Sequence, residues 1–406
     1  MMQIPSATRK SGYGRGPQTS NAALTEVGPG TPGGEYLRRY WHPVALSSEA
    51  ERTPRRVRVL GENLVIYRDG GGRVGLLHER CAHRGTSLYY GKTTDNGIRC
   101  CYHGWLFDAE GHCLEQPCEP GGGAHRDKVT QPWYPVQERY GLVFAYLGPI
   151  DCMPPLPRFD TFENPAPGEQ IWPERDTAAS CFLDSAVSID VVPYNYFQYW
   201  ENILDTYHVK ILHNTFTDVA QFPGVLALDF RVEWELLSDG VLAHSYRDVD
   251  GRVLHRISQC TLPNIVAIGD LDGRAGNARR LNWIVPVDDV GWISFGISRG
   301  KQQWNDSDAV ALTPDGKTWS QMSESERQRY PGDFEAQSSQ GKITLHSEEH
   351  LGRSDKGVIM LRRLVLKQIA AMREGGAPVR LGDGDEALVR VRGGGFYDDA
   401  ASPPSE

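Results

Sequence analysis

The first part of the chain has the alternating apolar and polar pattern of short β-strands. Residues 55–68 alternate in this way, with a turn expected at residues 61–63. Asp69 and three glycines after it form a second turn signal, which leads into an apolar segment that begins at Val74. Because such turns between alternating segments favour hairpins, we expect a small all-β domain. Its last strand is expected near residues 143–149, before a proline-rich linker.

The later part of the chain shows a helical period. Between residues 197 and 214, apolar residues recur at helical spacing, namely Phe197, Trp200, Ile203, Leu204, Tyr207 and Ile211. This period predicts an amphipathic helix. Residues 357–373, rich in Leu, Ile, Val and Arg, predict a second amphipathic helix that covers a sheet. A β domain followed by a mixed domain gives an α+β fold.

Length and composition agree with a folded chain of more than one domain. The chain has 406 residues, of which 44 are glycine and 26 are proline, and this usage favours many turns. Its net charge of −9 argues against nucleic acid, whose binding needs clustered cations. No segment approaches the roughly 20 apolar residues of a membrane span, and residues 1–16 lack the apolar core of a signal peptide. We therefore expect a cytoplasmic protein with no nucleic-acid and no membrane partner.

Five of the eight cysteines lie between residues 81 and 118, which favours metal chemistry over disulfides in a reducing compartment. Two tight pairs are present, Cys81-Ala-His83 and Cys100-Cys-Tyr-His103, so two loops can enclose one centre. Zinc fingers also use two Cys and two His, but they place the two Cys in one pair and the two His in the other. One Cys and one His from each loop suit a centre with two unlike irons, as in a Rieske [2Fe–2S] cluster.

The segment CAHRG…CCYHGW resembles the Rieske motif Cys-x-His…Cys-x₂-His, which favours Cys100 over Cys101 as the ligand. Such a cluster passes single electrons. Residues 28–33 fit the phosphate-binding pattern G-x-G-x-x-G, but Pro29 and Pro32 remove two N–H groups that would bind a pyrophosphate. With no nicotinamide or flavin site predicted, the electrons are expected to come from another protein.

A second group of polar residues lies on the helix predicted within residues 197–214. Asn202, Asp205 and His208 follow at intervals of three, so successive members can interact along a helix. His213 comes five residues after His208, roughly 140° around a helix with about 100° per residue. The two histidines can bind one metal only if the helix ends, kinks or bulges between them. Otherwise they are core histidines, one of them paired with Asp205.

The series Asn202-x₂-Asp205-x₂-His208-x₄-His213 resembles the mononuclear-iron signature of the Rieske non-haem iron oxygenases. Together with the first motif, the resemblance covers most of the chain. It implies an all-β Rieske [2Fe–2S] domain and a helix-grip catalytic domain, in which a curved antiparallel sheet wraps a long helix. The expected divisions are an N-terminal segment at 1–40, the Rieske domain at 41–155, the catalytic domain at 156–380 and a flexible tail at 381–406.

The resemblance also implies that His208 and His213 bind Fe(II) with one carboxylate, a triad that leaves positions open for O₂ and substrate. We expect the carboxylate of Asp205 to bind the second ring nitrogen of His208. In the family, the same carboxylate bonds to a cluster histidine of the neighbouring subunit, here His103. The third ligand is assigned to Asp333, because the sequence that follows it resembles the phthalate-dioxygenase-like branch.

Some assignments stay open at this point. Asp218, Glu335 and Asp355 are the other carboxylates considered as the third ligand, and Ser338 stands where the branch usually has a glutamate. Four arginines could bind a substrate carboxylate or be solvated; they are Arg247, Arg256, Arg279 and Arg280.

The activity implied is that of an oxygenase component. It would take electrons from a separate NAD(P)H-dependent flavin or iron–sulfur reductase, directly or through a ferredoxin. With O₂ it would hydroxylate an aromatic, carboxylated substrate once or twice, or remove an O- or N-alkyl group. A homotrimer or a stacked hexamer is expected. The alternatives from other classes are a Rieske electron carrier and a structural zinc module.

Overall fold

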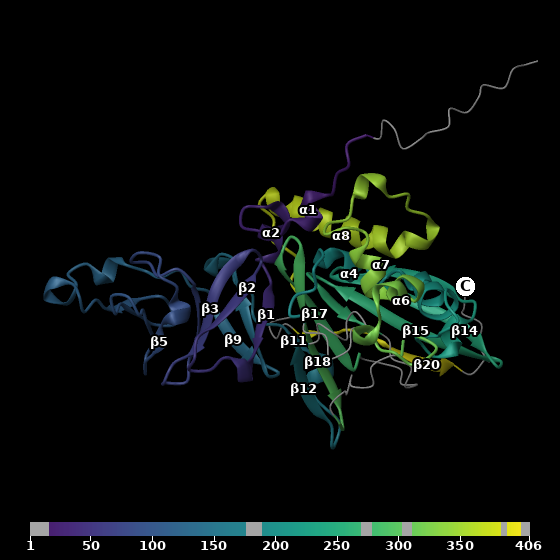
Figure 1. The fold of residues 1–406 in the computed structure, drawn as a ribbon, viewed down its shortest axis with the longest axis horizontal. Coiled ribbons are helices and arrows are strands. Elements are labelled where there is room, and N and C mark those ends of the chain that lie inside the picture. The colour runs from purple at the N-terminus through teal and green to yellow at the C-terminus, as the bar shows by residue number, and fades with distance from the viewer. Residues whose placement is uncertain (1–15, 176–188, 269–277, 303–310, 383–387, 399–406) are drawn as a thin grey trace, which may run out of the picture.

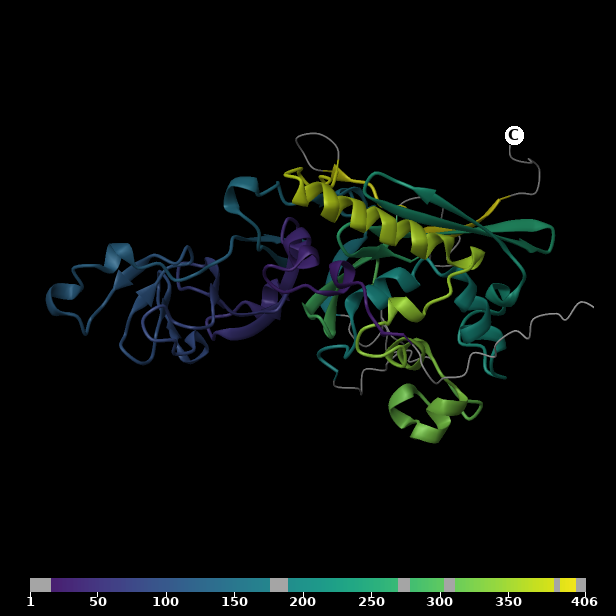
Figure 2. The same ribbon diagram turned by 90° about the horizontal axis from the view of Figure 1, so that it is seen from above.

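The structure is a computed structural model that describes residues 16–175, 189–268, 278–302, 311–382 and 388–398 (Figures 1 and 2). The first part consists of three small antiparallel sheets. Their orders are β1-β10-β9, β2-β3-β4 and β5-β6-β7-β8. The strands are β1 (Trp41–Leu46), β2 (Arg55–Val59), β3 (Glu62–Arg68), β4 (Val74–His78), β5 (Lys92–Thr93), β6 (Ile98–Arg99), β7 (Leu106–Phe107), β8 (Cys113–Glu115), β9 (Val136–Arg139) and β10 (Leu142–Tyr146).

The alternating segment 55–68 forms the predicted hairpin, but its turn lies at Leu60 and Gly61, one residue earlier than expected. Both residues have positive φ, 47° and 79°. A two-residue turn with two positive φ values follows the twist of the flanking strands, which favours it in hairpins.

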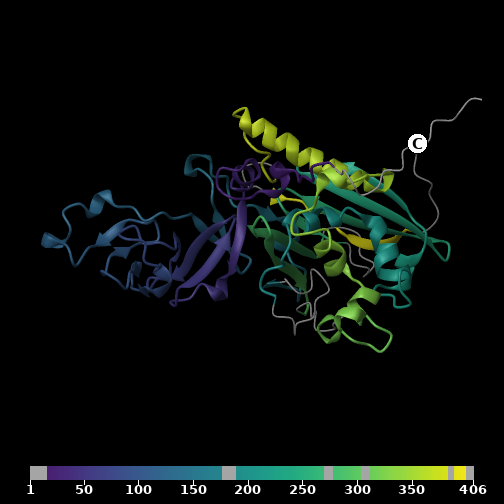
Figure 3. The ribbon, with the colours of Figure 1, turned by 45° about the horizontal axis from the view of Figure 1, so that its top comes forward.

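The second part is built on one large antiparallel sheet, in the order β12-β18-β17-β16-β15-β14-β13 with β20 also paired to β15. Helix α8 packs against β14 and β13 and covers this sheet (Figures 2 and 3). The strands are β12 (Gln170–Arg175), β13 (Arg231–Leu236), β14 (Gly240–Val249), β15 (Arg252–Thr261), β16 (Ile265–Ala267), β17 (Arg280–Asp288), β18 (Gly291–Gly300) and β20 (Gly394–Asp398). A short parallel pair joins β11 (Arg158–Phe159) to β19 (Leu388–Val389).

The helix predicted at residues 357–373 is confirmed as α8 (Lys356–Arg373). Its buried residues include Leu361, Leu364, Val365 and Ile369, the spacing of one apolar face. The other helices are α1 (Ala22–Thr25), α2 (Pro32–Leu37), α3 (Asp160–Glu163), α4 (Tyr196–Asn202), α5 (Thr206–Lys210), α6 (Glu324–Arg329) and α7 (Asp333–Ser338). A sheet that wraps a long helix, beside small β-sheets, confirms the α+β prediction.

The predicted flexible tail at 381–406 is wrong for the strands that it contains. Residues Gly394 to Asp398 pair with Ile257 to Val253 along β15, and the ring of Phe396 contacts that of His255 at 4.8 Å. Because β16 covers only the Gln259–Thr261 end of this edge, β20 pairs backbone groups of β15 that would otherwise remain open. The Gly, Asp and Pro content of the segment gave no sign of this strand.

A buried ion pair joins the end of α2 to β3 of the first part. Arg38 Nη2 lies 2.7 Å from Glu62 Oε1, and the two side chains are 6% and 9% exposed. The hydroxyl of Tyr134 donates to Glu62 Oε2 at 2.6 Å, and His78 Nε2 lies 3.1 Å from the same oxygen. Burial by itself raises the pKa of Glu62, but His78, Tyr134 and Arg38 lower it to about 2. The turn before Glu62 also bonds to β17, through Gly61 N and Val287 O at 2.9 Å.

None of the helices in the described ranges has the length and apolar character needed to cross a bilayer.

Candidate functional site

The two Cys–His pairs lie on two loops of similar geometry. The amide of Gly85 donates to Cys81 O at 2.8 Å, and that of Gly104 donates to Cys100 O at 3.1 Å. Both glycines have positive φ, 75° and 73°, a conformation that glycine adopts without strain. Each loop therefore turns sharply just after its histidine.

The structure brings all four side chains of these pairs together. Cys81 and Cys100 are 3% and 4% exposed and interact with each other, whereas Cys101 is exposed. Burial raises the pKa of the Cys81 thiol to about 12. The rings of His83 and His103 lie on the outer side, half-buried, with centroids 4.6 Å apart.

The two metal readings require different spacings of these four ligands. A single tetrahedral ion with bonds of about 2.0–2.3 Å needs closely grouped ligand atoms. Within the described part of the chain, the four Cys and His do not form a group of ligand atoms that all lie within 4.8 Å of one another. Two sulfurs inside and two imidazoles outside instead fit a centre with two irons.

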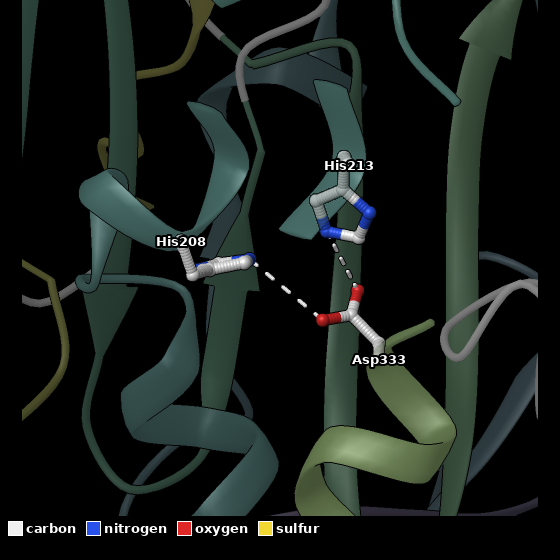
Figure 4. Close-up of side chains that lie close together, drawn as sticks. All are labelled: His208, His213 and Asp333. Atoms are coloured by element: carbon white, nitrogen blue, oxygen red, sulfur yellow. Dashed lines mark ion pairs between the residues drawn. The ribbon is translucent and has the colours of Figure 1, made fainter. Parts of the chain in front are cut away.

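The second group forms a compact triad. Ligand atoms of His208, His213 and Asp333 all lie within 4.8 Å of one another (Figure 4). Asp333 Oδ1 is 3.7 Å from His208 Nε2, and Asp333 Oδ2 is 3.4 Å from His213 Nε2. His213 and Asp333 are buried. Ligands at about 2.1 Å and right angles around one ion are about 3 Å apart, so the triad needs only a small contraction to bind one.

A π-helical turn aligns the two histidines. After α5, residues Ile211–Thr215 form the π-helix η7, which confirms the predicted bulge between His208 and His213. The wider turn rotates His213 toward His208, and their ring centroids are 5.2 Å apart. The predicted continuous helix is wrong at its centre, because α4 ends at Asn202 and Asp205 has φ −84° and ψ 80°.

Hydrogen bonds fix which nitrogen of each ring faces the triad. His213 Nδ1 lies 2.7 Å from Gln221 Oε1, and His208 Nδ1 bonds to the backbone carbonyl of Asp205. Since both partners are acceptors, each Nδ1 carries the proton and each Nε2 presents a lone pair. Two lone pairs and a carboxylate then converge on one point, an arrangement that a cation satisfies.

Charge in the triad follows from burial and proximity. Burial favours neutral His213, but Asp333 and Gln221 outweigh it and raise the pKa of His213. For Asp333, burial favours the neutral acid, but His213, His208 and Asn202 lower its pKa. The carboxylate is thus ionised.

Asp333 is the first residue of α7. Its carboxylate faces the histidines because Glu335, two residues later, provides the N-terminal cap of the helix. Glu335 Oε2 accepts from Gly332 N at 3.0 Å and so caps the helix in its place. Gln337 Nε2 donates to Asp333 Oδ1 at 3.4 Å, and Asn202 Nδ2 lies at the same distance from that oxygen.

The predicted bond from the Asp205 carboxylate to His208 is wrong in this structure. Asp205 Oδ2 is 3.9 Å from His208 Nδ1, beyond hydrogen-bond range. The non-helical backbone of Asp205, between α4 and α5, turns its carbonyl toward the ring instead. The side chain of Asp205 is 33% exposed. Burial raises its pKa, against the lowering effect of His208.

The other carboxylates considered lie elsewhere. Asp218 is exposed, Glu335 caps α7 and accepts from Trp319 Nε1 at 2.7 Å, and Asp355 Oδ2 accepts from Gly352 N at 2.6 Å. Sequence reasoning missed Gln221 and Gln337. Gln221 acts across eight residues from outside the helix, so no local pattern marks it. Gln337 lies four residues after Asp333 in the same helix, and that i,i+4 spacing is a local signal that could have found it.

Comparison with known proteins decides the family. The Rieske [2Fe-2S] domain family matches residues 40–135. The chain is 49% identical over 392 residues to the phenoxybenzoate dioxygenase subunit alpha of Ectopseudomonas oleovorans, covering 95% of this chain and 94% of the relative. The chain belongs to the Rieske non-haem iron oxygenases. It is 28% identical to the phthalate 4,5-dioxygenase oxygenase subunit of Pseudomonas putida, over 91% and 89% of the two chains.

Solved structures share the fold of this Rieske oxygenase. The NdmA QL mutant of Pseudomonas putida CBB5 with caffeine matches with a TM-score of 0.61 and 22% identity, over 88% of this chain and 95% of that one. Dicamba monooxygenase bound to dicamba matches with a TM-score of 0.58 and 17% identity, over 84% and 99%. The protein is the oxygenase component of a Rieske oxygenase, with a [2Fe–2S] cluster and a mononuclear iron, and it depends on a reductase component for electrons.

Proposed function

We propose that Cys81, His83, Cys100 and His103 bind the Rieske cluster. The buried thiols and the outer imidazoles support this assignment. When bound, the cluster supplies single electrons. Trp105 stacks on His83, with centroids 4.3 Å apart, and holds that ring in place. A Rieske domain at 41–155 and a catalytic domain at 156–380 remain our proposed divisions.

We propose further that His208, His213 and Asp333 bind the iron at which O₂ and substrate meet. The observation that carries this assignment is the convergence of two Nε2 lone pairs and one carboxylate. Three protein ligands leave three positions open on the iron. Asn202, whose Nδ2 is 3.5 Å from His208 Nε2, lies beside these positions and can orient what enters them.

Iron quantitation tests the assignment. An oxygenase with both centres should contain three irons per chain, and a Rieske carrier should contain two. Asp333→Ala should lower the count from three to two without changing the visible spectrum of the cluster. An unchanged count of three would contradict the role given to Asp333.

Electron transfer is proposed to cross between subunits of a homotrimer, which stacks into a hexamer if two rings associate. Figure 1 places β5, which follows the first cluster loop, at the far end of the molecule from α7. Exposed apolar side chains adjoin both centres. Tyr102, next to His103 in the sequence, is 58% exposed, and Ile211 and Phe216, in and just after the π-helix that carries His213, are 53% and 62% exposed. A head-to-tail ring would bury both surfaces. The half-exposed Asp205 would then receive a bond from His103 of the neighbour.

Mixed trimers test this arrangement. Subunits with His103→Ala lack a complete cluster site, and subunits with Asp333→Ala lack a complete iron site. Each variant should be inactive by itself, whereas co-expression should restore part of the activity through hybrid rings. Hybrid rings that stay inactive although both remaining centres are loaded would contradict transfer between subunits.

The proposed reaction is hydroxylation of an aromatic, carboxylated substrate, with one or two oxygen atoms inserted. Relatives named for phenoxybenzoate, phthalate and 3-chlorobenzoate support this class. A 34% identical relative is a 5,5'-dehydrodivanillate O-demethylase subunit, which supports oxidative demethylation as the second candidate. Turnover of aromatic acids and aryl ethers with reductase, NADH and ¹⁸O₂ distinguishes the two, because demethylation releases formaldehyde and hydroxylation retains labelled oxygen in the product.

A further inference from the structure

Two arginines lie on one buried face of the β14–β15 hairpin. Arg247 is 1% exposed and Arg256 is 8% exposed. The register pairs Arg247 with Leu254 and Ser245 with Arg256. Paired residues of antiparallel strands, and residues two apart, share a face, so both guanidinium groups leave the same side of the sheet. Because both side chains are buried, neither arginine is simply a solvated surface residue.

This face is the one that the metal-binding segment covers. Further along the same strands it carries Cys260, whose Sγ lies 3.2 Å from the carbonyl of Trp200 in α4. The charge of Arg256 acts on His213. The guanidinium of Arg247 lies 4.3 Å from the ring centroid of Phe230, and that ring contacts Tyr207, the neighbour of His208, at 4.9 Å. The arginines therefore lie on the side of the sheet that faces the triad, with Arg256 close enough for its charge to act on His213.

The positive charge of Arg247 lacks an anionic partner among the described residues. Its Nη1 donates to Ser245 Oγ at 3.0 Å, and its Nε is buried without a hydrogen-bond acceptor in that part of the chain. Burial and the charge of Arg256 lower the pKa of Arg247 to about 10, so it is still charged at neutral pH. Arg280 differs, because its Nη2 pairs with Glu174 Oε1 at 2.9 Å. A buried cation beside a like charge is costly unless an anion joins it.

We propose that Arg247, with Arg256, binds the carboxylate of the substrate and selects aromatic acids over neutral aromatic compounds. A guanidinium offers two parallel N–H donors that match a carboxylate. With the acid group fixed there, the ring would extend toward the triad past Phe222, whose ring is 4.7 Å from that of His213. The inference rests on the proposed function of the triad, because it places the substrate beside that iron.

Binding to the holoenzyme, measured by isothermal titration calorimetry, tests this inference without turnover. The probes are phenoxybenzoate and its neutral isostere phenoxybenzamide, followed by the benzoate and benzamide pair. The wild type should prefer each acid by at least about 10-fold. Arg247→Met should weaken binding of the acid about 10- to 100-fold, the value of a charge-assisted hydrogen bond, and should change amide binding less than about threefold.

The matched control is Arg252→Met. Arg252 lies on the same hairpin, is exposed, and stacks on Tyr397, so its loss should leave the preference for acids unchanged. The inference is overturned if the wild type binds amides as tightly as acids, or binds neither acid. It is also overturned if Arg247→Met weakens both probes equally or neither.

The comparison of acid with amide on the wild type decides the question even if the variant does not fold. Failure of this inference can be distinguished from failure of the proposed function. If a neutral aryl ether is oxygenated with coupled NADH consumption while acids do not bind, the oxygenase reading holds and the carboxylate site does not.

Discussion

The side chain of Gln221 should determine how tightly the iron is bound. It is 7% exposed, and its Oε1 accepts the Nδ1 proton of His213 at 2.7 Å. Its backbone amide donates to the carbonyl of His213 at 2.6 Å, so the residue fixes both the ring and the end of the π-helix. Gln221→Leu retains the size of the side chain and the backbone bond but removes the acceptor.

The size of the effect follows from the bond that is lost. A buried N–H left without a partner costs about 1–3 kcal/mol, and the proton is then free to move to Nε2, the nitrogen that faces Asp333. Loss of such a partner typically lowers metal affinity about 10- to 100-fold, or about 1.4–2.7 kcal/mol. Titration of the reconstituted protein with a chelator of known affinity measures it, while the absorbance of the cluster reports on the other centre.

Gln221→Glu is the matched control, because it keeps an acceptor at the same place and should retain iron at least as well as the wild type. An iron affinity of Gln221→Leu within about twofold of wild type would refute the reasoning. Equal loss of iron and cluster would also count against it, since that pattern indicates general unfolding.

Three further outcomes are expected. Asp333→Asn should keep the shape of the triad but lose its charge, so the mononuclear iron should fall well below one per chain while the cluster remains, as iron analysis and absorbance would show. Glu62 has a folded-state pKa near 2 against an ordinary value of 4.5, so its contribution to stability, about 3 kcal/mol, is complete above pH 4.5 and lost as the pH falls toward 2. Urea unfolding of Glu62→Gln should therefore differ most from wild type at pH 7 and little near pH 2; an equal difference at both would contradict this. A chain truncated after Arg392 lacks β20 and exposes the edge of β15, which should lower the melting temperature and promote association, as calorimetry and light scattering would detect.

Local spacing was enough to predict much of the molecule. The β-hairpin at 55–68 and helix α8 follow from periods of two and 3.6 residues, because those periods determine which side chains share a face. The large sheet of the second part was expected only from the family resemblance. The interval of five residues between His208 and His213 is also local. It requires a widened turn if both are to face one point, and the structure has that turn at Ile211–Thr215.

The sequence by itself determined the kinds of ligand and their pairing in loops, since each Cys–His pair and the two histidines of α5 and η7 lie within a few residues of each other. Only the tertiary structure decided what reaches them from far away. It brought Asp333 across 120 residues to His213, chose the backbone carbonyl of Asp205 over its carboxylate, and buried Arg247 on the face of the sheet below α4. These outcomes depend on how the helices pack on a curved sheet. That packing is determined by many contacts between segments that are distant in sequence, so a local pattern does not predict it.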